Sequence, residues 1–419
     1  MNDYRFPDNK ITRIAFPVML LMLQMVARST MYTSTFLGFA RSQITMIGLV
    51  LVTGLTFLIY NRKHLKKILK DQRMLAFAFA AVVVLGPMLI KQDWQLMYFT
   101  ILLGWLFAIF LTYFATLREV AGYYVRILFF LSIWMLVGQF ILKPLANMGI
   151  IPGFPFDSPG GWHMYNFGLT FAVNRNTEMV DALRVFGIFR EPGLYQIFLF
   201  IAIHLNNYHV DWDREWKLWL VNAVLFVSLL ITFCTGGVLA LALYIVFLFF
   251  DKGLYRNRQL QILAMILVAA VTVLLIIAVA RSDTWAMELV WMIQKVFEKT
   301  DSYTTRVDSV FMDAEIFFRH PLVGATLQEV LYSVPNNTAT SPILFAAFGI
   351  FGGCVHVLSW AALAWKKERS VLMNLLLMVI LFVPFNTQNV IYDMFFWLFP
   401  IMALTEQALP LLEKCKKKV

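Results

Sequence analysis

The stretch Ser42–Tyr60, SQITMIGLVLVTGLTFLIY, contains no charged residue and is followed directly by the basic run Asn61–Lys67, NRKHLKK. An α-helix rises about 1.5 Å per residue, so roughly 20 apolar residues are enough to cross the hydrocarbon core of a bilayer. Lys and Arg collect in the cytoplasmic loops of membrane proteins. The stretch therefore predicts a spanning helix whose C-terminal end faces the cytoplasm.

The same pattern recurs along the 419-residue chain, of which 60% is hydrophobic and 14% charged. A soluble domain has about 25% charged residues, so this composition excludes a single water-soluble core and a disordered chain. We expect one all-α polytopic membrane domain over residues 1–419 with about twelve transmembrane helices. The apolar windows lie near residues 11–27, 42–60, 74–90, 96–116, 127–148, 193–208, 218–234, 236–250, 262–280, 337–362, 371–387 and 391–408. The seventh and eighth would be joined by a tight turn around Thr235-Gly236-Gly237.

The formal net charge of +10 would suggest a nucleic-acid partner in a soluble protein. When the N-terminus is placed inside, however, most Lys and Arg residues fall in the short inner loops, which is the usual topology signal. We therefore expect a multi-pass membrane protein with both termini in the cytoplasm and no nucleic-acid partner. The polar segment Met1–Lys10 does not resemble a cleaved signal peptide, and the apolar run from Ile11 onward is interpreted as the first anchor.

Two predicted outer loops are long, at residues 149–191 and 281–336, and long loops are often functional. The first is rich in Gly, Pro and aromatic residues and ends in Arg190-Glu191-Pro192, where Pro192 suits the first turn of a helix. A helix N-terminus attracts anions, and Arg binds phosphate through its planar fork. Arg184 and Arg190 are therefore candidates for anion binding, although anchoring of the loop among lipid headgroups explains them equally well.

The second outer loop predicts an interfacial helix at 283–299 and a further helix over Val310–Arg319. Thr305 and Asp308 resemble a capping arrangement before that helix. Arg306 would lie near the helix start, where the dipole disfavours a cation, and this position is easier to explain if Arg306 faces an anion. Glu315 and Arg319 are four residues apart, and a solvated ion pair is the simpler interpretation of them.

Arg28 and Arg41 are predicted at the outer ends of the first two crossings, where they either snorkel to the headgroups or line the same outer cavity. The crossings contain almost no charge, which argues against an ion-coupled transporter. Asp211-Trp212-Asp213 has the spacing of a metal motif in nucleotide-sugar transferases, but its basic inner loop favours a solvated charge cluster. His163 and His320 have no second ligand at metal spacing, so we predict no metal site and no cofactor.

Four runs on the predicted outer face carry a resemblance to a known family. They are RVFGIFREPGLYQIFLFIAI (184–203), ITFCTGGVLALALYIV (231–246), TTRVDSVFMDAEIFFRHPLVGAT (304–326) and PNNTATSPILFAAFGIFGG (335–353). They combine an Arg and Gly before Glu-Pro-Gly, a tight turn, an Arg segment ending in His-Pro-Leu-x-Gly, and an Asn-rich helix entry. In this order they resemble bacterial O-antigen and capsular polysaccharide polymerases of the Wzy type.

The related O-antigen ligases share this plan but typically carry a histidine beside the Asn of the last run, where this chain has Asn336-Asn337. The ligases also often have an arginine in the tight turn, where Thr235-Gly236 stands here. Both differences favour a polymerase, and they leave the catalytic base unassigned. A ligase and a flippase for lipid-linked oligosaccharides are the alternatives.

The resemblance implies a C-type glycosyltransferase fold in the bacterial plasma membrane, which acts without a metal on undecaprenyl-diphosphate-linked glycans as donor and acceptor. It also implies work beside a chain-length regulator and a repeat-unit flippase. The leaving diphosphate needs cations, for which the candidates are Arg190 and Arg306, followed by Arg184, Arg319, Arg28 and Arg41. For the base that accepts the acceptor proton we put forward Glu191, then Asp308, although either carboxylate could instead be a structural partner of an arginine.

Overall fold

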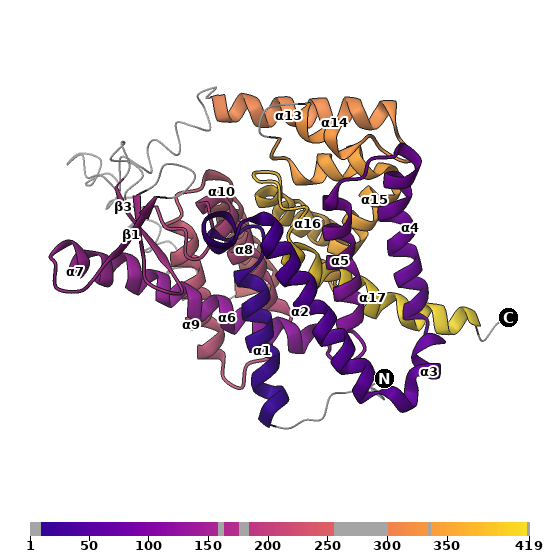
Figure 1. Cartoon of the computed structure of the whole chain (residues 1–419), viewed down its shortest axis with the longest axis horizontal. Coiled ribbons are helices and arrows are strands. Elements are labelled where there is room, and N and C mark those ends of the chain that lie inside the picture. The colour runs from indigo at the N-terminus through magenta and orange to yellow at the C-terminus, as the bar shows by residue number, and fades with distance from the viewer. Residues whose placement is uncertain (1–9, 158–162, 176–183, 255–300, 334–336, 417–419) are drawn as a thin grey trace.

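The computed structural model describes residues 10–157, 163–175, 184–254, 301–333 and 337–416, and this part of the chain is mostly helical (Figure 1). The helices in chain order are α1 (Lys10–Met25), η1 (Tyr32–Leu37), α2 (Phe39–Tyr60), η2 (Arg62–His64), α3 (Leu65–Leu69), α4 (Arg73–Lys91), α5 (Leu96–Leu111), α6 (Leu117–Val137), η3 (Gly138–Leu142), α7 (Lys143–Asn147), α8 (Pro192–Tyr208), α9 (Glu215–Leu230), α10 (Thr235–Asp251), α13 (Asp301–Arg319), α14 (Leu327–Tyr332), α15 (Thr340–Ala364), α16 (Val371–Phe385) and α17 (Met394–Lys416).

Within these residues, 4 helices are long and apolar enough to cross a membrane: Phe39–Tyr60, Arg73–Lys91, Leu117–Asn147 and Thr340–Ala364. Shorter apolar helices lie at Ile14–Met25, Leu96–Leu111, Thr235–Asp251 and Val371–Phe385. Large apolar side chains also cover the outward faces of α2 and α16, including Ile44, Ile59, Leu372 and Val379. Contiguous apolar surface of this kind marks contact with an apolar environment, and it is compatible with a membrane-embedded protein.

The apolar windows of the sequence coincide with helices wherever the structure describes them, whereas the window at 262–280 and the interfacial helix at 283–299 lie outside the described residues. One boundary differs clearly. The helix expected near residue 127 begins at Leu117 because Thr116 and Glu119 form a capping box, so Arg118 and Arg126 belong to the helix rather than to a loop.

The tight turn also lies earlier than expected. Helix α9 ends at Leu230 and α10 begins at Thr235, so the turn consists of residues 231–234, and Gly236 and Gly237 belong to the first turn of α10. Pro192 opens α8, as its sequence context predicts.

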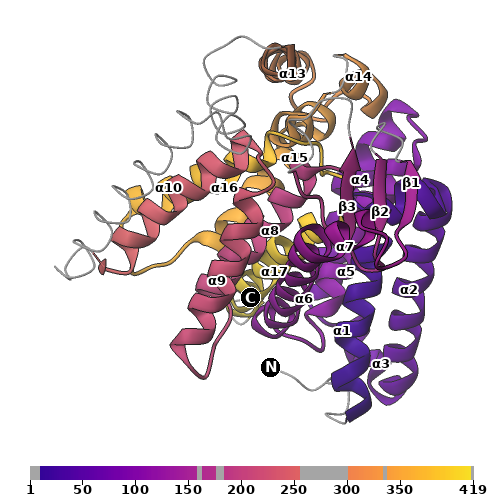
Figure 2. The same ribbon diagram turned by 90° about the vertical axis from the view of Figure 1, so that its left-hand side faces the viewer.

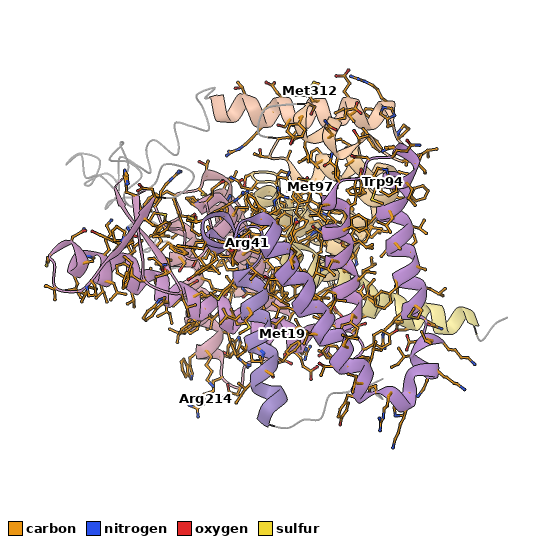
Figure 3. All side chains as sticks on the ribbon, viewed as in Figure 1. Met19, Arg41, Trp94, Met97, Arg214 and Met312 are labelled. Carbon is orange, nitrogen blue, oxygen red and sulfur yellow. The ribbon has the colours of Figure 1, made fainter. Side chains whose placement is uncertain are left out.

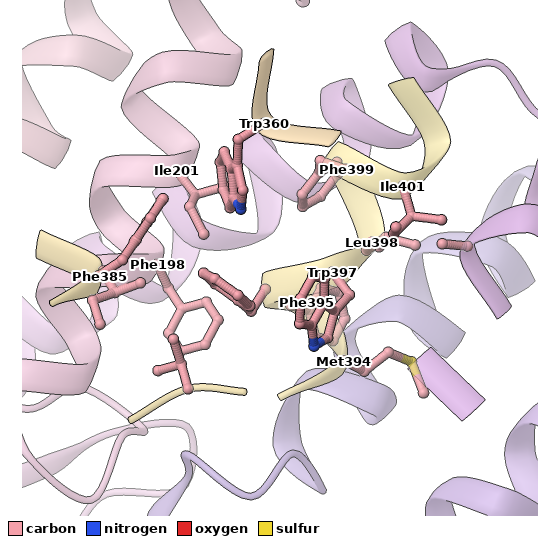
Figure 4. Close-up of a cluster of buried hydrophobic side chains, with 14 of the residues drawn as sticks. Phe198, Ile201, Trp360, Phe385, Met394, Phe395, Trp397, Leu398, Phe399 and Ile401 are labelled. Atoms are coloured by element: carbon pink, nitrogen blue, oxygen red, sulfur yellow. The ribbon is translucent and has the colours of Figure 1, made fainter. Parts of the chain in front are cut away.

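The core is built around α8, whose side chains from Pro192 to Asn207 are buried. Aromatic rings fill the space between this helix, α15 and α17 (Figure 4). Trp360 is completely buried, with its ring centroid 4.4 Å from that of Phe385, and Trp105 meets Trp397 at 5.1 Å. Such rings bury large apolar areas, so this cluster fixes the positions of the helix ends that carry the site.

The first long loop contains a small three-stranded antiparallel sheet, which the sequence did not predict, within a structure that is otherwise mostly helical. Its strands are β1 (Phe154–Asp157), β2 (His163–Asn166) and β3 (Phe171–Arg175), paired in that order. The sheet and α13 occupy the same half of the molecule in both views (Figures 1 and 2).

Helix α13 lies at the top of the molecule in the view of Figure 1. The chain is helical from Asp301 onward, nine residues before the predicted start at Val310. Thr305 and Asp308 therefore do not cap a helix, and Arg306 lies inside the helix, because no Gly or Pro interrupts the chain from Asp301 to Arg319. The segment that follows is anchored to the α4–α5 turn, since Asp93 Oδ2 accepts a hydrogen bond of 2.8 Å from Leu327 N.

Candidate functional site

A cavity of about 90 Å³ lies where the first helix ends, at the start of α8, and beside the loop of residues 386–393. This loop connects α16 to α17, and we call it the 386–393 loop. The cavity is lined by Arg28, Ser29, Arg190, Leu194, Asn389, Val390, Tyr392 and Asp393. Two of the sequence-predicted arginines thus meet in one chamber.

Backbone pairing between distant segments brings Arg28 and Arg190 together. Arg190 N donates to Ser29 O at 3.0 Å, and Met31 N donates to Ile188 O at 2.8 Å. These bonds form a short antiparallel bridge centred on Thr30 and Phe189. Arg190 follows Phe189 directly, and Arg28 lies two residues before Thr30. The main-chain hydrogen bonds of the bridge therefore fix the backbone positions of both arginines.

Arg28 is held by aromatic rings. Its guanidinium carbon lies 4.5 Å from the ring centroid of Tyr392 and 5.1 Å from that of Phe39, within the range of cation–π contact. Burial lowers the pKa of Arg28, the Tyr392 hydroxyl opposes this effect, and the positive charge of Arg190 lowers it further. A buried guanidinium that repels a second one is stabilised when an anion enters between them.

Arg190 retains a donor that the described protein atoms do not use. Its Nε is buried and donates no hydrogen bond within the described part of the chain. Glu191 Oε1 lies 3.8 Å from this nitrogen, which is an ion-pair distance but too long for a hydrogen bond. Arg190 is therefore able to bind a further acceptor.

Asp393 completes this chamber and was not singled out in the sequence. Its side chain is 2% exposed and accepts hydrogen bonds from Ser29 Oγ at 2.5 Å and from Phe395 N at 3.0 Å. The second bond caps α17, which begins at Met394. Asp393 falls inside the apolar window at 391–408, but the polar run Asn386-Thr-Gln-Asn389 just before it is the signal that could have revealed it.

Arg184 and Arg306 form a second pair, beside the α9–α10 turn. Arg184 Nη2 donates to Phe233 O at 2.9 Å, and Val185 N donates to Ile231 O at 3.3 Å, so the turn fixes Arg184. Arg306 is half-buried on α13. Burial lowers the pKa of Arg306, the Cys234 thiol opposes this effect, and the neighbouring Arg184 lowers it further.

Glycines let the 386–393 loop lie directly against the helix starts. A Cβ added at Gly193 would lie 2.5 Å from Gln388 Nε2, and one at Gly236 would lie 2.4 Å from Thr387 Cγ2. Gln196 Nε2 also donates to Thr387 Oγ1 at 2.8 Å. Gly193 and Gly236 therefore serve the same purpose: the absence of a side chain at each position lets the 386–393 loop pack closely against the helix.

The other predicted residues lie apart from these pairs. Arg319 Nη2 donates to Glu315 Oε1 at 2.5 Å, and both side chains are more than half exposed, which confirms the solvated ion pair. Asp308 is exposed on α13. Arg41 is exposed on α2 (Figure 3).

The Asp211-Trp212-Asp213 motif is a charge cluster, as its composition suggested. Asp211 pairs with Arg118, and Asp213 pairs with Lys217 Nζ at 2.7 Å. The adjacent Arg214 lies at the opposite end of the molecule from Met312 on α13 (Figure 3). Among the described residues, no three His, Cys, Asp or Glu side chains are grouped so that they could hold a metal ion.

One further buried carboxylate was missed. Asp313 lies on the inner face of α13, fully buried, and its Oδ1 accepts a hydrogen bond of 2.8 Å from Asn337 Nδ2. Burial raises the pKa of Asp313 to about 7, and the Asn337 bond opposes this effect. Asp313 is not among the residues that line the chamber, and its hydrogen bond to Asn337 instead ties α13 to the segment before α15.

Comparison with known proteins gives no relative: no protein-family model, no curated protein and no solved structure matches this chain.

Proposed function

We propose that the chain is a polysaccharide polymerase, a glycosyltransferase that joins undecaprenyl-diphosphate-linked repeat units into O-antigen or capsular polysaccharide. The observation that carries this proposal is the chamber whose lining contains both Arg28 and Arg190. Two half-buried guanidinium groups, one of them with an unused Nε donor, are suited to a diphosphate, because Arg pairs with phosphate oxygens through parallel hydrogen bonds.

The chemistry places specific demands on such a site. An acceptor hydroxyl attacks the anomeric carbon of the donor glycan, and undecaprenyl diphosphate leaves with a developing negative charge. Preorganised cations lower the free energy of that transition state. The reaction also requires two lipid diphosphates, one on each glycan, and the pairs Arg28–Arg190 and Arg184–Arg306 supply enough guanidinium groups to hold one each.

The finer architecture belongs to the same proposal. We place about twelve crossings in the bacterial plasma membrane, in a C-type glycosyltransferase arrangement with both termini in the cytoplasm. The sheet, α13 and the arginine pairs then face the outer side, where lipid-linked repeat units are polymerised. A chain-length regulator and a repeat-unit flippase are the expected partners.

The test uses the bacterial strain that makes this polysaccharide. Its gene for this protein is deleted, and single variants are then expressed in its place. Arg28→Ala and Arg306→Ala should leave lipid-linked glycan with a single repeat and no ladder of longer chains. Arg28→Lys should also fail, because an ammonium does not reproduce the bidentate fork or the stacking on Tyr392. Arg41→Ala is the matched control, since it removes an exposed arginine that lies outside both pairs.

Product size separates the alternatives. A normal ladder in both Ala variants would remove the arginine pairs from the mechanism. If the wild type attached one finished chain to another acceptor without adding repeats, the protein would be a ligase. If the purified protein in liposomes moved the lipid-linked unit between leaflets and formed no glycosidic bond, it would be a flippase.

A further inference from the structure

Asp393 combines burial with a place in the wall of the arginine chamber. The groups that act on its carboxylate come from four elements. Ser29 donates to it from the segment after α1, and Phe395 N donates from α17. Arg190 reaches it electrostatically from the start of α8, and Tyr124 does so from α6.

Capping of α17 does not account for all of these features. A cap needs one side-chain oxygen, and Asn or Ser serves as well as Asp. The second carboxylate oxygen is instead held by Ser29 at 2.5 Å beside two arginines. A carboxylate that is oriented by a hydroxyl and faces a cation-lined chamber is the arrangement expected of a proton acceptor.

We infer that Asp393 is the general base that accepts the proton of the acceptor hydroxyl. This inference rests on the proposed polymerase function and goes beyond it, because it assigns the base. The acceptor oxygen forms a bond to the anomeric carbon as the bond from that carbon to the diphosphate oxygen breaks. The electron pair of the broken bond leaves on undecaprenyl diphosphate, and the hydroxyl proton moves to Asp393, which returns it to water before the next addition.

Other carboxylates fit this role less well. Glu191 is 46% exposed at its side chain and faces Arg190, and Asp308 is exposed on α13. Asp313 is buried but does not line the chamber. Asp393 differs from these three carboxylates because it is buried, accepts a hydrogen bond from Ser29 Oγ and lines the chamber.

The test measures ladder formation by the purified protein in liposomes. The substrate is the lipid-linked single repeat isolated from cells that lack this chain. Asp393→Asn is the informative variant because Asn keeps the cap of α17, so the apparent melting midpoint should stay near the wild-type value. Its kcat should fall by about 10²–10⁴-fold, with KM within about threefold of wild type. The wild-type rate should rise with pH as the carboxyl group of Asp393 loses its proton.

Two further variants keep the test decisive. Asp313→Asn is the matched control for removing a buried carboxylate, and it should retain the wild-type pH profile. Ser29→Ala removes the hydroxyl that stabilises the ionised form of Asp393, so the midpoint of its pH–rate curve should move upward while the rate at high pH is kept. A purely structural Asp393 predicts no such movement.

The inference is overturned if Asp393→Asn keeps more than a third of the wild-type kcat, or if Ser29→Ala leaves the pH midpoint in place. These results would leave the polymerase itself intact, provided that the wild type makes a ladder and Arg28→Ala does not. Absence of a wild-type ladder would instead overturn the proposed function.

Discussion

The most direct test of the fold concerns Gly349, where α15 bends. Its backbone lies at φ 61° and ψ −160°, a region that is open to Gly and strained for other residues. A Cβ at this position would lie 2.3 Å from Leu322 O, and one at Gly324 would lie 2.4 Å from Ala347 C. The segment after α13 therefore rests on the bent main chain of α15 without any side chain between them.

The cost of Gly349→Ala follows from these two effects. The strained backbone costs about 1–3 kcal/mol. Separating two packed main chains to admit a methyl group costs about 1–3 kcal/mol more, because the obstacle is a carbonyl group and not the end of a flexible side chain. Gly38 is the matched control, since its φ is +76° but no atom lies within 4 Å of an added Cβ. Gly38→Ala should therefore show only the cost of the strained backbone.

The assay is the apparent melting midpoint of the purified protein in detergent, followed by the fraction that stays monodisperse after heating. The expected order is wild type highest, Gly38→Ala lower and Gly349→Ala lowest. Gly349→Ala should also shorten the glycan ladder, because the segment on α15 holds the end of the helix that carries Arg306. A midpoint for Gly349→Ala equal to or above that of Gly38→Ala would refute the proposed contact.

Three further outcomes follow from buried groups. Arg369 binds Asp251 at 2.6 Å with side-chain exposures of 6% and 12%. Arg369→Ala should therefore lower the free energy of unfolding by about 3–5 kcal/mol, because it leaves a buried carboxylate without its partner. The apolar double replacement Arg369→Met with Asp251→Leu should lower it less. Burial raises the pKa of Asp313 to about 7, so folding takes up a proton, and stability that is present below about pH 4 should be lost as the pH rises through 7. Melting midpoints from pH 4 to 8 should show this loss in the wild type and not in Asp313→Asn. Trp360→Ala should lower the free energy of unfolding by about 3–5 kcal/mol in denaturant titrations, because the ring is completely buried against Phe385.

The helices were predictable because their signal is local. Long uncharged runs such as residues 42–60 have one stable backbone arrangement in an apolar environment, since every peptide group must be hydrogen-bonded within the segment. Pro192 was likewise predictable as a helix start, because proline in the first turn loses no hydrogen bond.

The sheet was not predictable from the same evidence. Its third strand is held by a contact from outside the sheet, in which Phe171 N donates to Gly187 O at 3.0 Å. Trp134 Nε1 on α6 also donates to Phe167 O at 3.1 Å. These contacts join residues that are far apart in the chain, and no local periodicity records them.

The site was predictable in its residue types but not in its arrangement. Arg28, Arg190, Arg184 and Arg306 were all candidates because they lie beside predicted outer helix ends. Which of them meet depends on backbone bonds between segments more than 150 residues apart, such as that from Arg190 N to Ser29 O. Asp393 was hidden because its neighbours are apolar, and single-residue hydropathy does not distinguish a helix cap from a membrane core.

A structural arginine of the same chain gives a comparison for the two arginines of the chamber. Arg369 donates to both carboxylate oxygens of Asp251, at 2.6 and 3.0 Å, as expected of a structural ion pair. In the chamber, Arg28 is held between aromatic rings, and Arg190 leaves Nε without a hydrogen bond among the described atoms. Burying cations without full pairing costs free energy, and proteins retain such arrangements chiefly at functional sites. A chain that pairs one arginine so completely and leaves two others facing a cavity is better explained if an anion binds between them.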